Sequence, residues 1–436
     1  MNQPQHYGIV GGGMLGMTLA HRLAQAGRRV SLFEASEEWG GLAACWEIGG
    51  VIWDRHYHVI LLSDSHLRRL LAELGLERDI RWVETRTGFF TEGKFHSMSD
   101  LLEFLRFPPL SPLDRLRLGA TVFYASRVRN WRKLERIPVC EWLEKWSGRR
   151  ACEKIWFPLL RAKLGENYRK ASAAFIWTHI ARMYAARRAG LKKELLGYVP
   201  GGYRRILARF TEALEAEGVR LKLRHEARRV APVPEGRLAV EFAHGHCETF
   251  DRVILTVPSP AAASLCPALP EPEKARLNGI EYQGIVCASV LLRKPLMGFY
   301  VTNLTDSRAP FTGVIEMSAL VGREYFGGNT LVYLPKYVPS DDAAFRRSDA
   351  ELRDEFVGAL KKMYPALEAE DVVCFRVSRV PRVFPIPTVS YSERLPGMET
   401  SIAGLHIVNS SQILNGTLNV NDTVQQAQRC AESILR

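Results

Sequence analysis

Residues 7–34 read YGIVGGGMLGMTLAHRLAQAGRRVSLFE, and this stretch decides the fold. Residues 7–10 are a short apolar strand, and the turn GGGMLG at residues 11–16 follows directly and opens a helix. Residues 29–33 form a second strand, which closes with Glu34. The order of strand, glycine turn, helix and strand predicts a βαβ unit at the start of a parallel sheet.

The glycines of this turn predict a dinucleotide site. Gly11 permits a tight turn, Gly13 lets the backbone approach a diphosphate, and Gly16 allows the helix to pack closely on the strand. The free N–H groups of the first helical turn then point at the phosphates. Glu34, 23 residues after Gly11, accepts hydrogen bonds from ribose hydroxyls and repels a 2′-phosphate. NADP is therefore disfavoured at this site.

A second glycine pair, Gly40-Gly41, follows the unit. The run from residue 11 to residue 41 resembles the FAD-binding segment of the flavin-containing amine oxidase superfamily, which includes protoporphyrinogen oxidase, phytoene desaturases and UDP-galactopyranose mutase. The resemblance implies FAD as the cofactor, with bound NAD or a glycine-rich loop without a ligand as alternatives. The residues expected to contact FAD are Gly11, Gly13, Met14, Leu15, Gly16, Glu34, Ala35, Gly40, Gly41, Leu42, Val230, Thr256, Pro258, Asn409, Val420 and Asn421.

Later segments resemble the same superfamily in the same order. They are YVPGGYRRIL at 198–207, DRVILTVP at 251–258, the strand GLHIVN at 404–409 and the helix start NVNDTVQQA at 419–427. In the superfamily an acidic residue usually ends the third of these stretches, but this chain has Asn409, which keeps an acceptor and removes a charge. A helix start beside the flavin stabilises the negative charge of the reduced ring.

The middle of the chain is similar to a narrower group, the bacterial protoporphyrinogen-oxidase-like FAD-dependent oxidoreductases. The matching stretches are 156–165, 311–316, 331–342 and 409–412. The resemblance thus covers nearly the whole chain. It implies an α/β fold with a Rossmann-like FAD-binding domain and an inserted α+β substrate domain, as in the amine-oxidase and glutathione-reductase type of two-domain flavoprotein.

We expect both domains to be discontinuous. The FAD-binding domain comprises residues 1–95, 197–275 and 396–436, and the substrate domain comprises 96–196 and 276–395. Apolar spacing predicts helices and strands in the two insertions. The predicted helices are 100–106, 112–136, 139–146 and 349–363, and the predicted strands are 284–292 and 329–334.

The positive charge of the chain is concentrated in one segment. The net charge is +12, and residues 101–200 hold 21 Lys and Arg against 8 Asp and Glu. No nucleic-acid-binding motif accompanies them, so we expect no nucleic-acid partner. An anionic or lipid-linked small substrate fits better, as does peripheral contact with an anionic membrane through the aromatic and basic segment 124–136. A solvated helix is the alternative for this segment.

Composition also bears on the compartment. The eight cysteines include no CxxC pair and no metal-ligand spacing, so we expect free thiols and no metal site. Residues 1–5 lack the features of a secretory signal, and the most apolar run, 171–184, is broken by His179 and Arg182. We expect a cytoplasmic protein, with association at a membrane surface as a further possibility.

Few catalytic side chains are expected, because a flavin performs the difficult step. A histidine-bearing segment lies close to the isoalloxazine in the sugar mutases, so His58 and His56 are candidates to donate to flavin or substrate. Arg161 and Lys163 are candidate clamps for a carboxylate or diphosphate. Arg382 is a candidate for the cavity lining, with Arg379 beside it on the chain. Structural hydrogen bonds or surface positions are the alternatives for all of these side chains.

The predicted function is oxidation or desaturation of a small-molecule or lipid-linked substrate by hydride transfer to FAD. Two alternatives remain: a non-redox flavoenzyme of the UDP-galactopyranose mutase type, in which reduced flavin is the nucleophile, and a non-catalytic FAD-binding protein of a biosynthetic complex. The sequence predicts neither the electron acceptor nor the oligomeric state.

Overall fold

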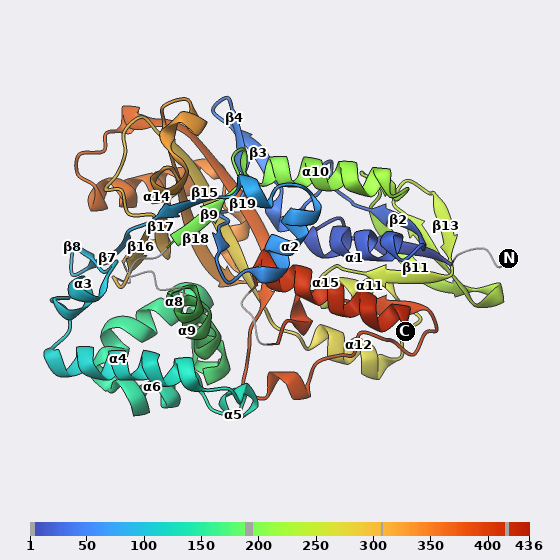
Figure 1. Cartoon of the computed structure of the whole chain (residues 1–436), viewed down its shortest axis with the longest axis horizontal. Coiled ribbons are helices and arrows are strands. Elements are labelled where there is room, and N and C mark those ends of the chain that lie inside the picture. The colour runs from blue at the N-terminus through green and yellow to red at the C-terminus, as the bar shows by residue number, and fades with distance from the viewer. Residues whose placement is uncertain (1–4, 188–194, 307, 415–417) are drawn as a thin grey trace.

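The predicted Rossmann-like unit forms around one parallel sheet (Figure 1). The computed structural model describes residues 5–187, 195–306, 308–414 and 418–436. The sheet has the strand order β10-β2-β1-β14-β20, and all four neighbouring pairs are parallel. Its strands are β1 (His6–Val10), β2 (Arg29–Phe33), β10 (Arg220–Lys222), β14 (Arg252–Leu255) and β20 (Leu405–Ile407). Segments that are far apart in the sequence thus share one sheet, which confirms the predicted fold class.

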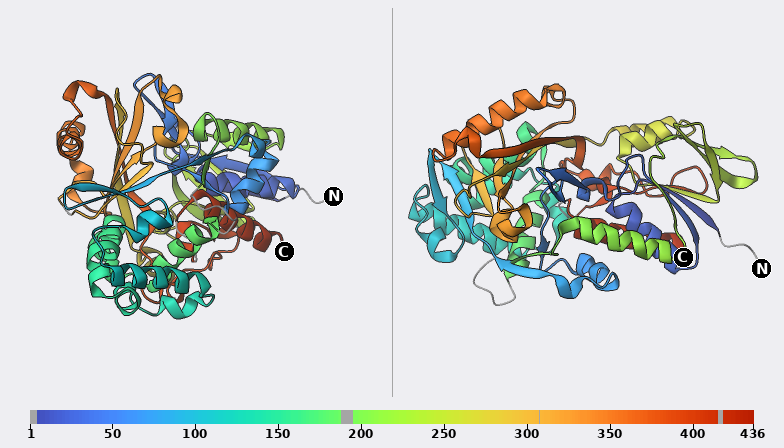
Figure 2. Two further views of the ribbon diagram at one scale, coloured as in Figure 1. Left: turned by 60° about the vertical axis from the view of Figure 1, so that its left-hand side comes forward. Right: turned by 90° about the horizontal axis from the view of Figure 1, so that it is seen from above.

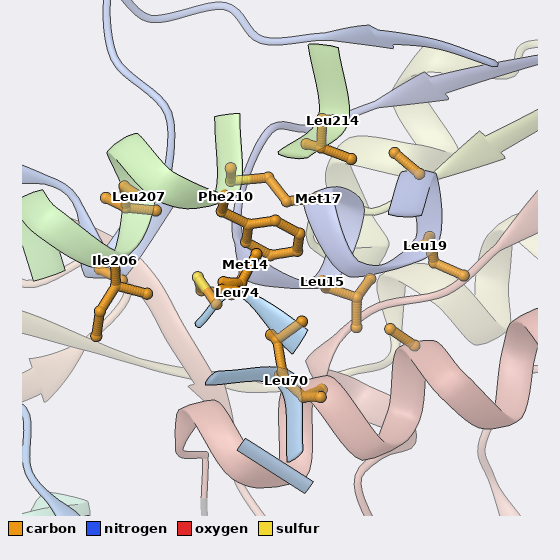
Figure 3. Packing of buried hydrophobic residues seen from close by; sticks show 14 of the residues in the cluster. Met14, Leu15, Met17, Leu19, Leu70, Leu74, Ile206, Leu207, Phe210 and Leu214 are labelled. Atoms are coloured by element: carbon orange, nitrogen blue, oxygen red, sulfur yellow. The ribbon is translucent and has the colours of Figure 1, made fainter. Parts of the chain in front are cut away.

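Four helices pack on one face of this sheet. They are α1 (Met14–Gln25), α2 (Ser65–Glu73), α10 (Gly202–Ala216) and α15 (Val420–Leu435). Ile9, Leu32 and Ile254 point from the sheet into the same fully buried core. Figure 3 shows Phe210 of α10 lying beside Met17 of α1 within it. Burial of these large apolar side chains holds the start of α1 in place.

The opposite face of the sheet is covered by a small antiparallel sheet. Successive side chains of a strand point to opposite faces of the sheet. Phe33 and Leu255 therefore point away from the four helices, and they pack against Val240 and Phe250. The covering elements are β11 (Ala227–Val233), β12 (Arg237–Phe242), β13 (Cys247–Phe250), α11 (Ser259–Leu265) and α12 (Glu271–Asn278). The nucleotide-binding lobe therefore has three layers.

A second, seven-stranded sheet has the order β19-β15-β18-β17-β16-β7-β8. Its strands are β7 (Thr87–Thr91), β8 (Lys94–Ser97), β15 (Tyr282–Leu292), β16 (Val301–Leu304), β17 (Gly313–Glu316), β18 (Thr330–Pro339) and β19 (Val372–Pro385). Helix α14 (Asp349–Met363) packs on it and has the predicted bounds. Because β7 pairs in parallel with β16, residues 87–95 lie with the second insertion rather than in the nucleotide-binding lobe, where the sequence analysis placed them.

The first insertion is a group of helices at the end of the molecule away from the two labelled termini (Figure 2). Its helices are α3 (Leu101–Leu105), α4 (Pro112–Arg127), α5 (Trp131–Glu135), α6 (Val139–Ser147), α7 (Arg149–Ala151), α8 (Phe157–Leu164) and α9 (Ala173–Arg187), with a π-helical turn at Cys152–Trp156. The single helix predicted over 112–136 is instead two helices. The break lies at residues 128–130, where the Asn130 side chain accepts a hydrogen bond from Lys133 N–H and caps α5.

Two smaller sheets connect the lobes. The hairpin of β3 (Cys45–Ile48) and β4 (Val51–Asp54) follows the second glycine pair, and β9 (Leu195–Tyr198) pairs with both β5 (Ile60–Leu61) and β6 (Arg81–Glu84). Within the described residues, every helix is too short or too polar to cross a lipid bilayer.

Candidate functional site

The turn between β1 and α1 has the geometry that a diphosphate site needs. Gly11 has a φ of +112°, and a Cβ atom there would lie 2.3 Å from Thr256 Oγ1. A Cβ atom on Gly16 would lie 1.9 Å from Gly11 O, so the close approach of helix to turn requires glycine. A Cβ atom on Gly13, in contrast, would lie 3.9 Å from its nearest neighbours, Gly40 O and Gly41 Cα. The turn is tight on one side and open at Gly13.

The start of α1 is available to an anion. Gly13 is the N-cap residue, no side chain caps the helix, and its first turn, which includes Met14 and Leu15, holds no acidic residue. Uncapped N–H groups and the positive end of the helix dipole together favour a phosphate. These features fit the diphosphate of a dinucleotide.

Glu34 is held in place at the end of β2 by two backbone groups. Its Oε2 atom accepts a hydrogen bond from Gly12 N–H at 2.7 Å, and its Oε1 atom accepts one from Ser36 N–H at 2.9 Å. Each carboxylate oxygen keeps a second acceptor position for a ribose hydroxyl. Ala35, which the sequence also assigned to this site, lies between Glu34 and Ser36 in the chain.

The second glycine pair lies against the first. Gly40 N–H donates to Gly12 O at 2.9 Å, and Gly40 forms an isolated parallel bridge with Gly13. Residues 41–43 then form a short 3-10 turn that includes Leu42. The predicted cofactor contacts of the N-terminal segment are therefore brought together by tertiary structure.

Among the predicted contacts from the middle of the chain, Thr256 supports the glycine turn. Thr256 Oγ1 lies 3.0 Å from both Val10 O and Gly11 O, so its hydroxyl braces the glycine turn. Val230 is a fully buried core residue, and Pro258 is the N-cap residue of α11.

The C-terminal candidates use their side chains within the protein. Asn409 is buried; its Nδ2 group donates to Val257 O at 2.9 Å and its Oδ1 atom accepts from Ser411 N–H at 3.0 Å. Asn421 Oδ1 accepts from His66 N–H at 2.9 Å at the start of α2. Val420 lies at the first turn of α15. The amide at position 409 thus has a capping role that the sequence did not predict.

The histidine-bearing segment lies next to the second glycine pair. His56 Nδ1 is 3.2 Å from Leu42 O, and His58 Nδ1 is 2.9 Å from His56 O. Burial lowers the pKa of each imidazole to about 4, so both rings are neutral near pH 7. The His58 ring lies 4.8 Å from that of Tyr203. Neutral rings that donate through Nδ1 keep Nε2 as an acceptor.

Several buried polar atoms in and beside this segment have no hydrogen-bond partner in the described part of the chain. They are Trp53 Nε1, Arg55 Nε, His56 Nε2 and Tyr203 OH. Buried polar groups are rarely left unpaired in native proteins, so these atoms point to a bound polar group at this place. This observation fits a flavin lying between the glycine turns and the histidine-bearing segment.

Sequence reasoning missed Asp54, the last residue of β4. Asp54 is 3% exposed, and its Oδ1 atom accepts from Tyr203 N–H at 2.8 Å and from Cys45 Sγ at 3.5 Å. Burial raises its pKa to about 7. The carboxyl group ties the β3–β4 hairpin to the start of α10. The sequence signal that could have identified Asp54 is an acidic residue at the end of an apolar strand.

A cavity of about 290 Å³ is lined by residues of α9, β18, β19 and the segment that follows β20. One face of α9 lines it through Phe175, Thr178, His179 and Arg182, which follow helical spacing. The further lining includes Glu135, Lys163, Tyr337, Val383, Phe384, Tyr391, Ser410, Ile413, Leu414 and Leu418. His179 and Arg182, the polar residues that interrupt the most apolar stretch of the chain, therefore face a cavity. That interruption is the sequence signal that could have identified them as cavity residues.

The cations of the cavity are held by neighbouring groups. Lys163 Nζ donates to Tyr337 OH at 2.6 Å, and Tyr337 OH is 3.0 Å from Tyr57 OH, next to the candidate histidines. Arg182 donates to Asp64 Oδ1 at 3.0 Å. Lys163 thus links the cavity to the segment that bears His56 and His58.

The other predicted cations lie elsewhere. Arg161 pairs with Glu166 at 2.8 Å in a separate surface groove, so α8 does not bring it together with Lys163. Arg382 is exposed and does not line the cavity, and Arg379 pairs with Asp349 at 2.6 Å.

Comparisons with known proteins agree with this geometry. A 15-cis-phytoene desaturase of Narcissus pseudonarcissus is 20% identical over 98% of this chain and 79% of that protein. A proposed protoporphyrinogen oxidase from an Exiguobacterium species has a TM-score of 0.79 and 20% identity over 99% of both chains. The structure of reduced UDP-galactopyranose mutase has a TM-score of 0.75 and 15% identity over 100% of this chain and 94% of the other. These structural likenesses show a shared fold.

The family itself follows from a match along almost the entire chain. The model of the family described as flavin containing amine oxidoreductase matches residues 15–435. The cofactor is FAD, which the glycine turns, Glu34 and the unpaired buried atoms fit, and the protein is an FAD-dependent oxidoreductase. The chain belongs to the flavin containing amine oxidoreductase family.

Proposed function

We propose that the protein oxidises or desaturates an amphipathic substrate held in the cavity beside α9. The observation that carries this proposal is the position of the cavity. Ser410 and Leu418 border it, and they lie between β20 and α15, the elements expected beside the flavin. Bound FAD would supply the hydride acceptor for this oxidation, with oxygen or another two-electron acceptor to reoxidise it.

The cavity lining supports a substrate with an apolar body and an anionic group. Phe175, Phe384 and Leu418 supply apolar wall, which favours a hydrocarbon and excludes water. We propose that Lys163 and Arg182 hold the anionic end. Both cations are already fixed by hydrogen bonds, so binding costs little side-chain entropy.

We propose that the neutral histidines orient the reacting groups. The Nδ1–H group of each ring donates to a backbone carbonyl, which fixes the ring. His56 Nε2 then accepts a hydrogen bond from flavin or substrate at the unpaired position. With a pKa of about 4, neither ring carries a proton to donate from Nε2 near pH 7.

We also propose that the protein works in the cytoplasm, at the surface of an anionic membrane that supplies a lipid-linked substrate. A shallow groove supports this, because four of the six side chains that line it are cationic: Arg129, Arg132, Lys133 and Arg136. Such a groove attracts phosphate headgroups. Helix α5 carries Arg132 and Lys133 of this groove and also Glu135, which lines the substrate cavity.

Anaerobic mixing tests the catalytic proposal. The oxidised holoenzyme is mixed with isoprenoid and acyl compounds that carry a phosphate or carboxylate, and the flavin absorbance is followed. Bleaching by one of these compounds, without added reductant, is the expected result. Turnover that occurs only after prior reduction of the flavin would show a non-redox reaction instead. Unchanged absorbance and no turnover across the panel would contradict catalysis on this substrate class.

A further inference from the structure

Exposed apolar side chains gather on α3 and α4. Of the ten large apolar side chains that are exposed in the described part of the chain, six belong to these two helices. Leu102 is 63% exposed, Leu116 70% and Phe123 54%, and Leu105, Leu113 and Tyr124 are the others. Single exposed leucines are ordinary, but such a concentration marks an interaction surface.

Helix α4 has apolar residues on two opposite faces. Leu118 and Ala125 are buried and pack into the core of the helical insertion. Leu113, Leu116 and Phe123 follow one another at three and seven residues, so they share the outward face. Phe104 of α3 lies 3.9 Å from the Cβ position of Gly119, which brings α3 against α4. The outward residues contribute nothing to this core.

Exposed cations lie on α4, at the end of α3 and in the segment that follows α4. They are Arg106, Arg117, Arg127, Arg129, Arg132 and Lys133, all exposed, and none of them forms an ion pair in the described part of the chain. The Arg127 guanidinium lies 4.8 Å from the centre of the Phe123 ring. Apolar side chains flanked by unpaired cations are complementary to a surface with an anionic rim and an apolar interior.

We propose that the outward face of α3 and α4 inserts its leucines and Phe123 into an anionic lipid bilayer while the exposed cations meet the headgroups. This inference rests on the proposed membrane contact and deepens it, because the groove beside α5 is mainly basic and α3 and α4 add apolar contact.

Vesicle flotation of the holoenzyme tests the inference. The vesicles contain equal parts of phosphatidylcholine and phosphatidylglycerol, and the wild type is compared with the double variant Leu116→Gln/Phe123→Gln. Glutamine keeps helix propensity and adds no charge. Each lost apolar side chain should weaken partitioning about tenfold. The double variant should also lose the binding that the wild type retains at high salt, where electrostatic attraction is screened.

Two further variants separate the possible outcomes. Met297→Gln removes an exposed apolar side chain outside α3 and α4 and should bind vesicles as the wild type does. Arg132→Glu/Lys133→Glu should weaken binding at low salt. If the glutamine variant binds like the wild type while the glutamate variant does not, insertion is wrong and the basic contact stands. If the wild type binds no vesicles, the proposed membrane contact and the proposed insertion both fail. The anaerobic assay tests the catalytic proposal independently.

The same variants distinguish a lipid surface from a second copy of the chain. The mass in solution is measured by sedimentation, and the fold of each variant is checked by its flavin absorbance and thermal midpoint. A wild-type dimer that Leu116→Gln/Phe123→Gln converts to a monomer would show that this face binds another protein molecule. That result would overturn membrane insertion.

Discussion

At the residue scale, the site is defined by buried polar groups that need partners. Tyr203 OH and His56 Nε2 have none in the described part of the chain, whereas Asp54 has two. The unpaired atoms fit a polar ligand at this place, and the paired carboxyl group holds the hairpin beside them. A buried carboxyl group also makes stability depend on pH.

We expect Asp54→Asn to stabilise the protein in alkaline solution. The pKa of Asp54 is raised from 3.8 to about 7 on folding, so the folded state binds the proton more tightly between these values. The free energy of unfolding therefore falls as pH rises through this range. Asparagine keeps the acceptor for Tyr203 N–H and carries no charge, so it should gain roughly 1–3 kcal/mol at about pH 8 and little at about pH 4.

Thermal unfolding of both proteins across this pH range measures the effect. Asp341→Asn is the control, because it removes one negative charge from an exposed position. If the difference in midpoint between Asp54→Asn and the wild type does not grow with pH, the carboxyl group is ionised in the folded protein at all these pH values.

At the element scale, α8 and α9 decide which predicted cations take part. Lys163 and Arg161 are two positions apart at the end of α8. Lys163 lines the cavity, whereas Arg161 pairs with Glu166 on the outside. Helix α9 contributes His179 and Arg182 from one face. Residues two positions apart on a helix point in different directions, which the sequence pattern alone did not resolve.

We expect Lys163→Met to weaken binding of an anionic substrate while Arg161→Met does not. Methionine keeps the unbranched stem and removes the charge, so loss of a charge-assisted hydrogen bond should raise KM about tenfold. Perturbation of the flavin spectrum by the anionic compounds of the panel gives Kd in the same experiment. Equal effects of the two variants would mean that Lys163 does not contact the anionic group.

At the scale of the whole molecule, the predicted FAD site draws on segments that are distant in sequence. The Gly40–Gly41 pair lies against the glycine turn, and the parallel sheet holds β14 and β20, which precede Thr256 and Asn409, together with β1. A ligand that binds the folded state alone stabilises it by mass action. FAD binding and the stability of the folded state are therefore coupled.

We expect the thermal midpoint of the apoprotein to rise with added FAD. At a free FAD concentration one hundred times Kd, the stabilisation is about 2.7 kcal/mol, which amounts to a shift of a few degrees in a chain of this size. Gly16→Ala is the matched control, because its Cβ atom would lie 1.9 Å from Gly11 O and distort the turn. A midpoint of the wild type that stays constant, or one of Gly16→Ala that rises equally, would contradict the assigned site.

The sequence by itself determined the nucleotide-binding unit. Gly11, Gly16 and Glu34 act within one contiguous βαβ segment, so local spacing and backbone geometry are enough to predict their arrangement. The extent of α14 was predictable for the same reason, since its pattern is periodic and its Ser348 cap is local.

Only the tertiary structure decided the rest of the site. The pairing of β7 with β16, the cavity face of α9 and the position of Lys163 depend on contacts between segments far apart in the chain. Asn409 shows the same limit, because its amide caps a turn and bonds Val257 O, a partner 152 residues away. Side-chain direction follows from packing between elements, and local periodicity does not encode which partner each face will meet.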